Sequence, residues 1–568
     1  IPPSFIPPTS FPEAMPSSPS SLHWMSLAAA IWLQASTGTN FNFPAYSSQL
    51  KSLLSMSQLQ LNNLAFASDA GKLFGWFSGL AAARFPLWFL LLTGSLLGSA
   101  GYGAQYLFLA LPVSSVAYWQ VFALSTLAGN SICWINTVCY VVVIKNFPSN
   151  RQAAVGLSTS YQGLSAKIYT AIVDVALSYS PTSTPTPAKR AKAYLLFSTV
   201  LPPLVCAVTA PFAREVSEEG FSEGRTRPNR ERGFVLLFAI TIGTGVFSVF
   251  TSLRSTSRAL SPLGSAIGLG VFLAAPLLAP LSAKNRELWR QRKWASENRV
   301  HVIAEPEMDG GGHDHDKDEE CTSDDHENDG GIRVPGGGAD EECVSEGRVV
   351  VEEVEASVML RRTEFWLYFF VYMFGASIGL VFLNNLGQIA DSRGSYSGAG
   401  PLVSLSSSFG FFGRLVPSLL DYFFSGCSHF SSKPAASMAA LMAPMCGAFF
   451  LLLHPSEAAL YVSTAVIGVC TGAITSLAVS VTTELFGVKH FSTNHNVLVS
   501  NIPLGSFLFG TLAAVAYHRE GRRVGDSDGG CLGTACYRWT FLVWGCLCFT
   551  GTILAWVLHA RTRRLRQT

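Results

Sequence analysis

Charged side chains inside long apolar segments are the first candidates for function, because a charge within lipid is costly and is usually retained for a functional reason. Lys167 is the deepest of them, in an apolar segment that spans 153–178. Asp174 follows seven residues later and therefore lies on the same helical face. Two interpretations stay open. Either Lys167 faces a central cavity and attracts an anionic substrate, or Lys167 and Asp174 form a structural pair against another helix.

Further ionisable residues recur at short spacings in or beside apolar segments. Asp69 and Lys72 are three residues apart, so on a helix they can neutralise each other, which indicates a structural or gating role. Arg414 and Asp421 lie seven residues apart near one segment end, and Glu484 ends another. We interpret these as locks between moving helices, with snorkelling towards lipid headgroups as the competing explanation. Proton coupling would use Asp69 or Glu484.

Amide side chains form a second group of candidates. Asparagine and glutamine are costly against lipid, so their recurrence inside apolar segments indicates a shared aqueous path for a solute. His495 lies in a polar cluster of the same kind. Together with Lys167, the candidates that line this path are Gln34, Asn40, Asn136, Gln162, Asn384, Asn385, Gln388, Asn494 and Asn501.

Catalytic and metal-binding patterns give little support to an enzyme. No HExxH helix, P-loop or dinucleotide-binding glycine pattern occurs, and no nucleic-acid motif occurs either. His313, His315, Cys321 and His326 can be drawn as a metal site, but their spacing matches no zinc framework. We therefore interpret them as part of a solvated acidic linker and expect no metal and no cofactor.

The elements that carry these residues are long apolar runs. Of the 568 residues, 49% are hydrophobic and only 13% are charged, about half the charged fraction of a soluble domain. Runs of this length predict transmembrane helices rather than strands, hence an all-α polytopic membrane protein of about 14 spans. Six, two and six spans are predicted at 24–46, 62–83, 86–109, 117–144, 153–178, 193–213; 233–252, 261–282; and 364–386, 400–424, 434–453, 457–484, 493–517, 538–560.

The distribution of charge sets the expected orientation and domain division. Residues 305–355 hold 19 Asp and Glu, whereas Lys and Arg dominate the C-terminal tail and most loops of one side, which places both termini in the cytoplasm. The expected parts are a disordered Pro/Ser-rich tail (1–21), a first six-helix bundle (22–213), two additional helices (214–283), a cytoplasmic acidic linker (284–362), a second six-helix bundle (363–561) and a basic tail (562–568).

Two cysteines stand apart from the others, which occur mostly within the apolar spans. Cys531 and Cys536 lie in a polar loop that the predicted orientation places outside the cytosol. A disulfide and two free thiols are equally compatible with that position. The plasma membrane and an endomembrane such as the vacuole are both compatible with the sequence.

Six spans, a long linker and six spans resemble the major facilitator superfamily, with two helical halves around a central site. Individual sequence motifs indicate a narrower family. The chain resembles the nodulin-like, or nuclear-fusion-defective-like, transporters through the stretches WLQASTGTNFNFPAYSSQLK, SDAGKLFGWFSGL, KNFPSNRQAAVGLSTSYQGLSAKIYT, FWLYFFVYMFGASIGLVFLNNLGQI, FGRL and TTELFGVKHFSTNHN. This resemblance implies the two extra central spans. The basic loop motif of the superfamily is reduced to Arg84 between spans 2 and 3.

The sequence therefore predicts a secondary transporter that moves a small solute across a bilayer by alternating access. A small organic anion such as a monocarboxylate is favoured, because Lys167 is buried and some relatives are described that way; protons are the candidate coupling ion. The alternative is a non-transporting membrane receptor or scaffold that acts through the acidic linker. A membrane-embedded enzyme is disfavoured by the missing catalytic groups.

Overall fold

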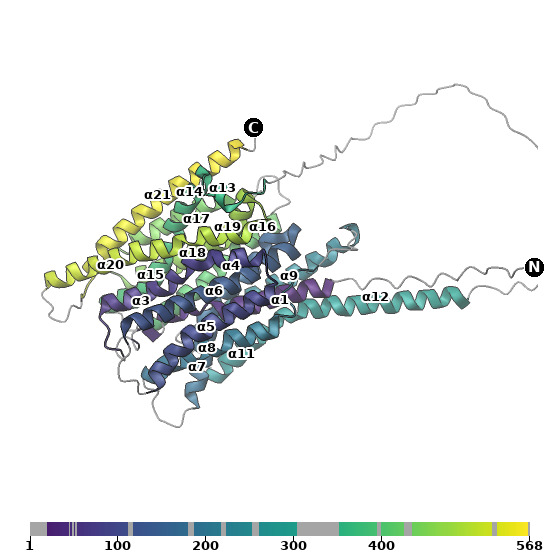
Figure 1. Ribbon diagram of the computed structural model, residues 1–568, viewed down its shortest axis with the longest axis horizontal. Helices are drawn as coiled ribbons and strands as arrows, with labels where there is room; N and C mark the ends of the chain where they lie inside the picture. Colours follow the sequence, from purple (N-terminus) through teal and green to yellow (C-terminus); the bar gives the residue numbers. More distant parts are fainter. Residues whose placement is uncertain are drawn as a thin grey trace, which may run out of the picture. The chain divides into compact units, whose positions relative to one another are not determined.

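The computed structural model describes most of the chain. The described residues are 20–44, 46–47, 50, 54–111, 117–179, 187–216, 223–252, 261–303, 352–394, 399–424, 434–524 and 531–565. Within them every regular element is a helix (Figure 1). The chain divides into two compact units, Ile1–Lys284 with Val351–Thr568 as the first and Asn285–Val350 as the second. Two predicted features lie outside the described residues. They are residues 1–19 of the predicted tail and the acidic stretch 304–351 with its candidate metal ligands.

The first half of the helical unit, here the elements α1 to α8, contains the first predicted bundle. Several of its expected spans are interrupted by short 3-10 segments, which are named η. Its elements are α1 (Ser20–Thr37), η1 (Thr39–Asn42), α3 (Gln58–Ala70), η2 (Gly71–Phe74), α4 (Gly75–Ala82), α5 (Leu87–Ala110), α6 (Tyr118–Asn146), η3 (Pro148–Asn150), α7 (Arg151–Ser178) and α8 (Pro187–Thr209).

The additional helices and the second half, here α13 to α21, follow. The additional helices are α9 (Glu223–Ser252), α11 (Pro262–Ala274), η4 (Ala275–Leu277) and α12 (Leu278–Ile303). The second half consists of α13 (Ala356–Met359), α14 (Thr363–Tyr372), the π-helical turn η5 (Met373–Ser377), α15 (Ile378–Ser392), α16 (Ala399–Phe424), α17 (Pro434–Leu451), α18 (Glu457–Phe486), α19 (Phe491–Val499), α20 (Asn501–Val524) and α21 (Ala535–Leu565).

Nine helical stretches in the described part of the chain are long and apolar enough to cross a bilayer. Helices α1, α7 and α16 coincide with predicted spans but are not among the nine. A physical reason is visible in α7, which buries hydroxyl side chains such as Ser158 and Ser165 against other helices instead of exposing an apolar surface. Hydropathy therefore understates the helices that line the interior of a bundle.

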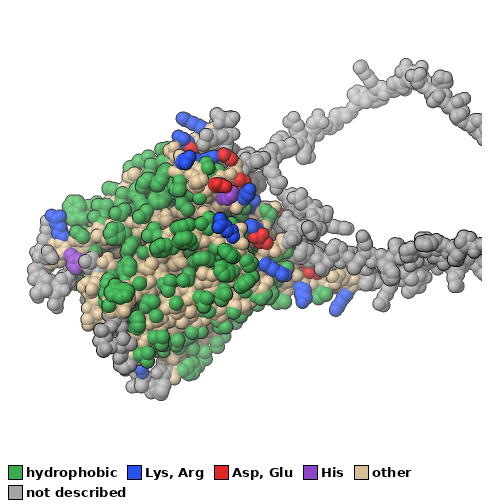
Figure 2. Space-filling model, in the orientation of Figure 1, with side chains coloured by type: hydrophobic (Ala, Val, Ile, Leu, Met, Phe, Trp, Pro, Cys, Tyr) green, Lys and Arg blue, Asp and Glu red, His purple; other side chains and the backbone are tan. Residues whose placement is uncertain are grey.

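The lateral surface is apolar. Figure 2 shows hydrophobic side chains over most of the visible face of the bundle, with charged side chains towards the ends of the helices. Large side chains such as Trp88, Leu96 and Trp119 are exposed there. A soluble protein would bury such residues, so this surface is suited to contact with lipid acyl chains.

The first predicted span is broken earlier than the sequence indicates. We expected one helix over 24–46, but α1 already ends at Thr37. The cause lies at Gly38, where a Cβ atom would come within 2.5 Å of the Ser165 side chain on α7. Only glycine permits this close approach, and the chain continues as the 3-10 turn η1.

The predicted linker is helical at both of its ends. Its first residues, from 284, continue α12 as far as Ile303, and its last residues contain the short helix α13. The predicted basic tail likewise begins as the last turn of α21, which reaches Leu565.

Candidate functional site

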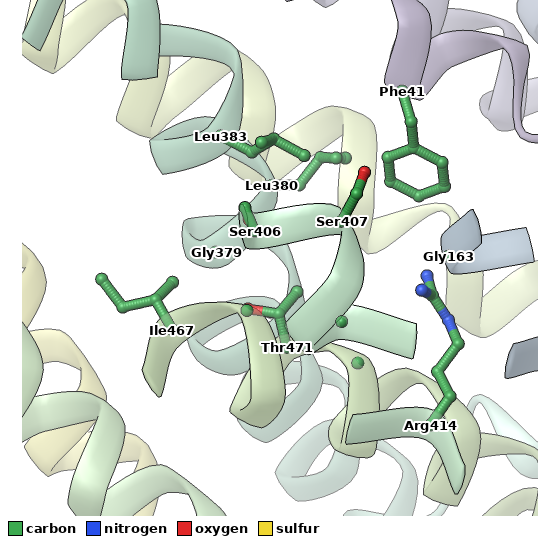
Figure 3. Close-up of a pocket in the computed structure, with 13 residues that line it drawn as sticks. Phe41, Gly163, Gly379, Leu380, Leu383, Ser406, Ser407, Arg414, Ile467 and Thr471 are labelled. Atoms are coloured by element: carbon green, nitrogen blue, oxygen red, sulfur yellow. The ribbon is translucent and has the colours of Figure 1, made fainter. Parts of the chain in front are cut away.

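A small cavity lies between the two halves of the helical unit (Figure 3). Its volume is about 40 Å³. Phe41 and Gly163 contribute to its wall from the first half, whereas all other lining residues come from α15, α16 and α18 of the second half. Those residues are Gly379, Leu380, Leu383, Ser406, Ser407, Gly410, Arg414, Ile467, Gly468, Thr471 and Gly472.

Arg414 is the cation of this cavity. Its side chain projects from α16 towards the first half, and the residue is only 6% exposed. The guanidinium carbon lies 5.5 Å from the centre of the Phe41 ring, a cation–π contact across the interface. Among the described residues, no carboxylate lies within 4.0 Å of this guanidinium and Nε has no hydrogen-bond partner. The cavity therefore contains a buried positive charge that the described protein groups leave uncompensated.

The close packing of α7 against α16 holds Arg414 in place. A Cβ atom at Gly163 would come within 2.6 Å of Nη1 of Arg414, so the absence of a side chain on α7 makes room for the guanidinium. One turn further along α16, the hydroxyl of Ser418 donates to the backbone carbonyl of Gln152, at 2.6 Å. Both contacts join the two halves of the chain.

Two tyrosines complete the electrostatic surroundings of the guanidinium. Tyr140 on α6 and Tyr372 on α14 lie near Arg414, one from each half. Tyr140 also meets the ring of His495 edge-on, at 5.3 Å between ring centres. The region of Arg414 is therefore aromatic and polar but holds no described negative side chain within ion-pair distance.

The sequence missed most of this cavity. Phe41 and Gly163 were not predicted, although each is the sequence neighbour of a predicted path residue, Asn40 and Gln162. The signal that could have found them is local: an aromatic residue inside the polar stretch TNFNF and a glycine beside a buried amide. Arg414 was predicted as a lock near its helix end, and the structure places it in the wall of the cavity.

Several of the predicted path amides hydrogen-bond to other parts of the protein. Asn385 donates to the Val381 carbonyl of its own helix, and Asn501 donates to the Phe369 carbonyl. Other amides serve similar purposes: Gln388 accepts from the Tyr537 hydroxyl, Asn494 donates to the Val354 carbonyl and Asn136 accepts from the Thr37 hydroxyl. None of the predicted amides, Gln34 and Asn384 included, is among the residues that line the cavity.

Lys167 is not among the residues that line this cavity. Its Nζ donates to the backbone carbonyl of Thr251, at 3.2 Å, in the last turn of α9. The last carbonyls of a helix lack intrahelical donors, and a cation is favoured there by the helix dipole. Asp174 is not its ion-pair partner, because the carboxylate pairs with Arg190 at 2.9 Å. Sequence spacing missed Arg190 because it comes from the neighbouring helix α8.

Asp69 and Lys72 form a buried ion pair, with 2.6 Å between Oδ1 and Nζ. The second carboxylate oxygen of Asp69 accepts a hydrogen bond of 2.8 Å from the hydroxyl of Ser506. Ser506 belongs to α20, so this contact joins the two halves. The rings of Phe66 and Phe507 also meet across the halves at a tilt, with ring centres 5.3 Å apart. We name this region the α3–α20 closure.

A second closure joins α4 and α19 at the opposite end of the corresponding predicted spans. The amide of Asn496 donates to the Thr137 hydroxyl at 2.9 Å, and the Ser492 hydroxyl donates to the Gly79 carbonyl at 3.1 Å. We name this region the α4–α19 closure. Glu484 and Asp421, the other predicted locks, lie in the last turns of α18 and α16.

Cys531, just before α21, and Cys536, in the first turn of α21, are joined by a disulfide. The segment just before α21 is tied to the helices, because the Cys531 amide donates to the Tyr517 hydroxyl and the Gly533 amide to the Ser392 carbonyl. In the described ranges, no group of three or more His, Cys, Asp or Glu side chains is arranged to hold a metal ion.

Two helical halves with a cavity between them define a membrane protein of the major facilitator type. Solved structures with this fold are similar over almost the whole chain. A proton-dependent oligopeptide transporter matches with a TM-score of 0.52 and 13% identity, covering 96% of this chain and 100% of that one. The proton:xylose symporter XylE matches with a TM-score of 0.52 and 10% identity, covering 95% and 96%.

The family follows from the sequence comparisons. The Nodulin-like family model matches residues 23–281, and the model of the NFD4 C-terminal domain matches 348–567. Protein NUCLEAR FUSION DEFECTIVE 4 of Arabidopsis thaliana is 36% identical over 553 residues, which cover 95% of this chain and 89% of that protein. The chain therefore belongs to the nodulin-like family, as the sequence motifs predict.

Proposed function

We propose that this protein is a secondary transporter that carries a small organic anion, such as a monocarboxylate, and that Arg414 binds the carboxylate. The observation that carries this proposal is the buried guanidinium of Arg414 in a cavity between the halves, without a described carboxylate partner. A buried charge is stable only when it is paired. An anionic substrate supplies the missing partner.

The chemistry of arginine favours a carboxylate over a neutral solute. The planar guanidinium offers a fork of N–H donors that matches the two oxygens of a carboxylate. The cavity volume of about 40 Å³ has room for about three water molecules in this conformation. A small anion is therefore the substrate that we propose.

Alternating access is supported by the two closures that join the halves. Each consists of a few side-chain contacts between the halves, such as Asp69 with Ser506 and Asn496 with Thr137. We infer that one closure opens while the other holds, so that Arg414 faces each side of the membrane in turn. About 14 spans, including α9 and α11, form the body of this transporter.

We also propose an orientation of the protein in the membrane and coupling of transport to protons. The distribution of Lys and Arg puts both termini in the cytoplasm, so the α4–α19 closure faces the cytoplasm and the α3–α20 closure faces the other side. Asp69 is the candidate for proton coupling, because its carboxylate is buried at an interface that must separate during transport. Protonation would neutralise it at the moment when Ser506 moves away.

The test is uptake into proteoliposomes with a panel of labelled short monocarboxylates and with xylose and a dipeptide as neutral or zwitterionic comparisons. We expect uptake of at least one monocarboxylate, loss of that uptake in Arg414→Gln, and partial retention in Arg414→Lys, which keeps the charge but not the fork. The matched control is Arg393→Gln, because Arg393 is bound to backbone carbonyls in the α17–α18 turn. Unchanged uptake in Arg414→Gln would refute the site.

A further inference from the structure

The segment that follows the acidic linker is bound to the turn between α18 and α19. The backbone amide of Val354 donates to the Phe486 carbonyl at 3.1 Å, at the end of α18. Met359, in α13, is fully buried in the core of the second half. The described chain therefore resumes at residue 352, beside this turn. Helix α14 begins eleven residues later, at Thr363.

Glu353 holds the turn itself. One oxygen of its carboxylate accepts from the Val488 amide at 3.1 Å, and the other accepts from the Lys489 amide at 2.8 Å. Gly487, just before them, has φ of +80°, and a Cβ atom there would come within 2.2 Å of the Glu353 carboxylate. Charge-assisted bonds to two successive amides hold a loop more firmly than neutral ones. This turn is therefore shaped around one carboxylate.

Helix α19 connects this turn to the opposite half of the chain. Asn494, fully buried, donates to the Val354 carbonyl at 2.8 Å. Asn496, two residues further on, donates to Thr137 of the first half at 2.9 Å. Residues two apart on a helix point about 200° apart, so the two amides lie on opposite sides of α19. One side of the helix binds the end of the linker and the other side binds the first half.

We propose that Glu353 is a positioning residue for the α4–α19 closure and that the linker acts on this closure through it. This inference rests on the proposed alternating access. Bound by Glu353, the turn sets the placement of α19, whose Ser492 and Asn496 contact the first half. Any binding event or modification that pulls residues 352–354 away from the turn loosens α19. The closure then opens more often, and the linker thereby regulates access to the central site.

The test is hydrogen–deuterium exchange of the full-length purified protein, read in peptides from α4 (Gly75–Ala82) and from the 487–499 region. The variant is Glu353→Gln and the matched control is Glu355→Gln, an exposed glutamate two residues away without a side-chain capping bond. We expect exchange in α4 to rise by roughly three- to tenfold in Glu353→Gln and to stay unchanged in Glu355→Gln. Helix α4 is informative because it belongs to the first half and packs against α19.

Faster exchange confined to 487–499, with α4 unchanged, would assign Glu353 a merely local role and overturn the proposal. If Glu353→Gln is not recovered folded, the same comparison uses Glu353→Asp, whose shorter side chain cannot reach both amides. No substrate is needed for this measurement. A transporter without organic-anion flux but with increased exchange in α4 would therefore refute the proposed substrate and leave the role of Glu353 supported.

Discussion

The carboxylate of Asp69 and the hydroxyl of Ser506 are joined by a hydrogen bond of 2.8 Å, although 437 positions separate them in the chain. The same carboxylate is neutralised by Lys72, three residues away. A single buried acid therefore serves two structures: an ion pair within the first half and a contact between the halves. Separation of the halves removes the second partner and leaves the first.

Replacement of Asp69 by asparagine tests whether this acid couples transport to protons. We expect Asp69→Asn to lose accumulation driven by an inward proton gradient by about tenfold, while exchange of labelled for unlabelled substrate continues. The reason is that exchange needs binding and rocking but no net proton movement. Both modes are measured in proteoliposomes.

Two variants control this result. Asp69→Asn leaves Lys72 buried without its partner, so the double variant Asp69→Asn/Lys72→Gln tests whether an unpaired cation, rather than lost coupling, causes the effect. Ser506→Ala removes the contact between halves but keeps the acid, and we expect it to retain gradient-driven accumulation. Equal loss of exchange and accumulation in Asp69→Asn would contradict a coupling role.

Phe41 should limit the size of the substrate. It covers the Arg414 guanidinium from the first half, so Phe41→Ala enlarges the cavity and removes a cation–π contact of about 0.5–2 kcal/mol. We expect weaker uptake of the smallest monocarboxylate and stronger competition by longer or branched ones. Phe41→Leu keeps most of the volume and is the matched control. An unchanged competition profile in Phe41→Ala would exclude this residue from selectivity.

Gly163 should be intolerant of a methyl group. The added Cβ atom would meet Nη1 of Arg414 at 2.6 Å, so Gly163→Ala must displace the guanidinium or separate α7 from α16. Because misplacement of a binding group is costly, we expect the KM for the anion to rise by about tenfold or more. Gly447→Ala on α17, where a Cβ atom meets nothing within 4 Å, should leave the KM unchanged. Equal KM values in the two variants would remove Gly163 from the site.

Lys167 should matter for stability and not for substrate affinity. Its ammonium group binds a carbonyl in the last turn of α9, so Lys167→Ala should cost about 1–2 kcal/mol and lower Tm in detergent. The KM for the anion should not change, because Lys167 is not among the residues that line the cavity. Thermal unfolding and uptake assays on the same preparation separate the two effects. A raised KM with an unchanged Tm would contradict this prediction and indicate that Lys167 contributes to substrate binding.

The sequence predicts contacts within one helix better than contacts between helices. The spacing of Asp69 and Lys72 predicts that they neutralise each other, and the structure places them 2.6 Å apart. The same argument fails for Lys167 and Asp174, because α9 and α8 bring competing partners that no spacing reveals. The cavity is missed for the same reason: Phe41 and Arg414 meet across the interface, 373 positions apart in the chain.

Helix identity, by contrast, follows from composition alone. Runs of apolar residues predict where most helices lie, and lipid leaves no other backbone structure for them. The break at Gly38 escapes this reasoning, because it depends on how closely α7 approaches and not on the local residue preferences of α1.

The buried hydroxyl groups of α7 and the buried Arg414 of α16 have a consequence for biogenesis. Neither helix is among the nine that are long and apolar enough to cross a bilayer by length and composition, and the two pack against each other. During synthesis α7 leaves the ribosome more than 200 residues before α16. The first half must therefore remain in the membrane for that time without α16 as the packing partner of α7. We expect a chain truncated before α16 to be degraded by membrane quality-control proteases.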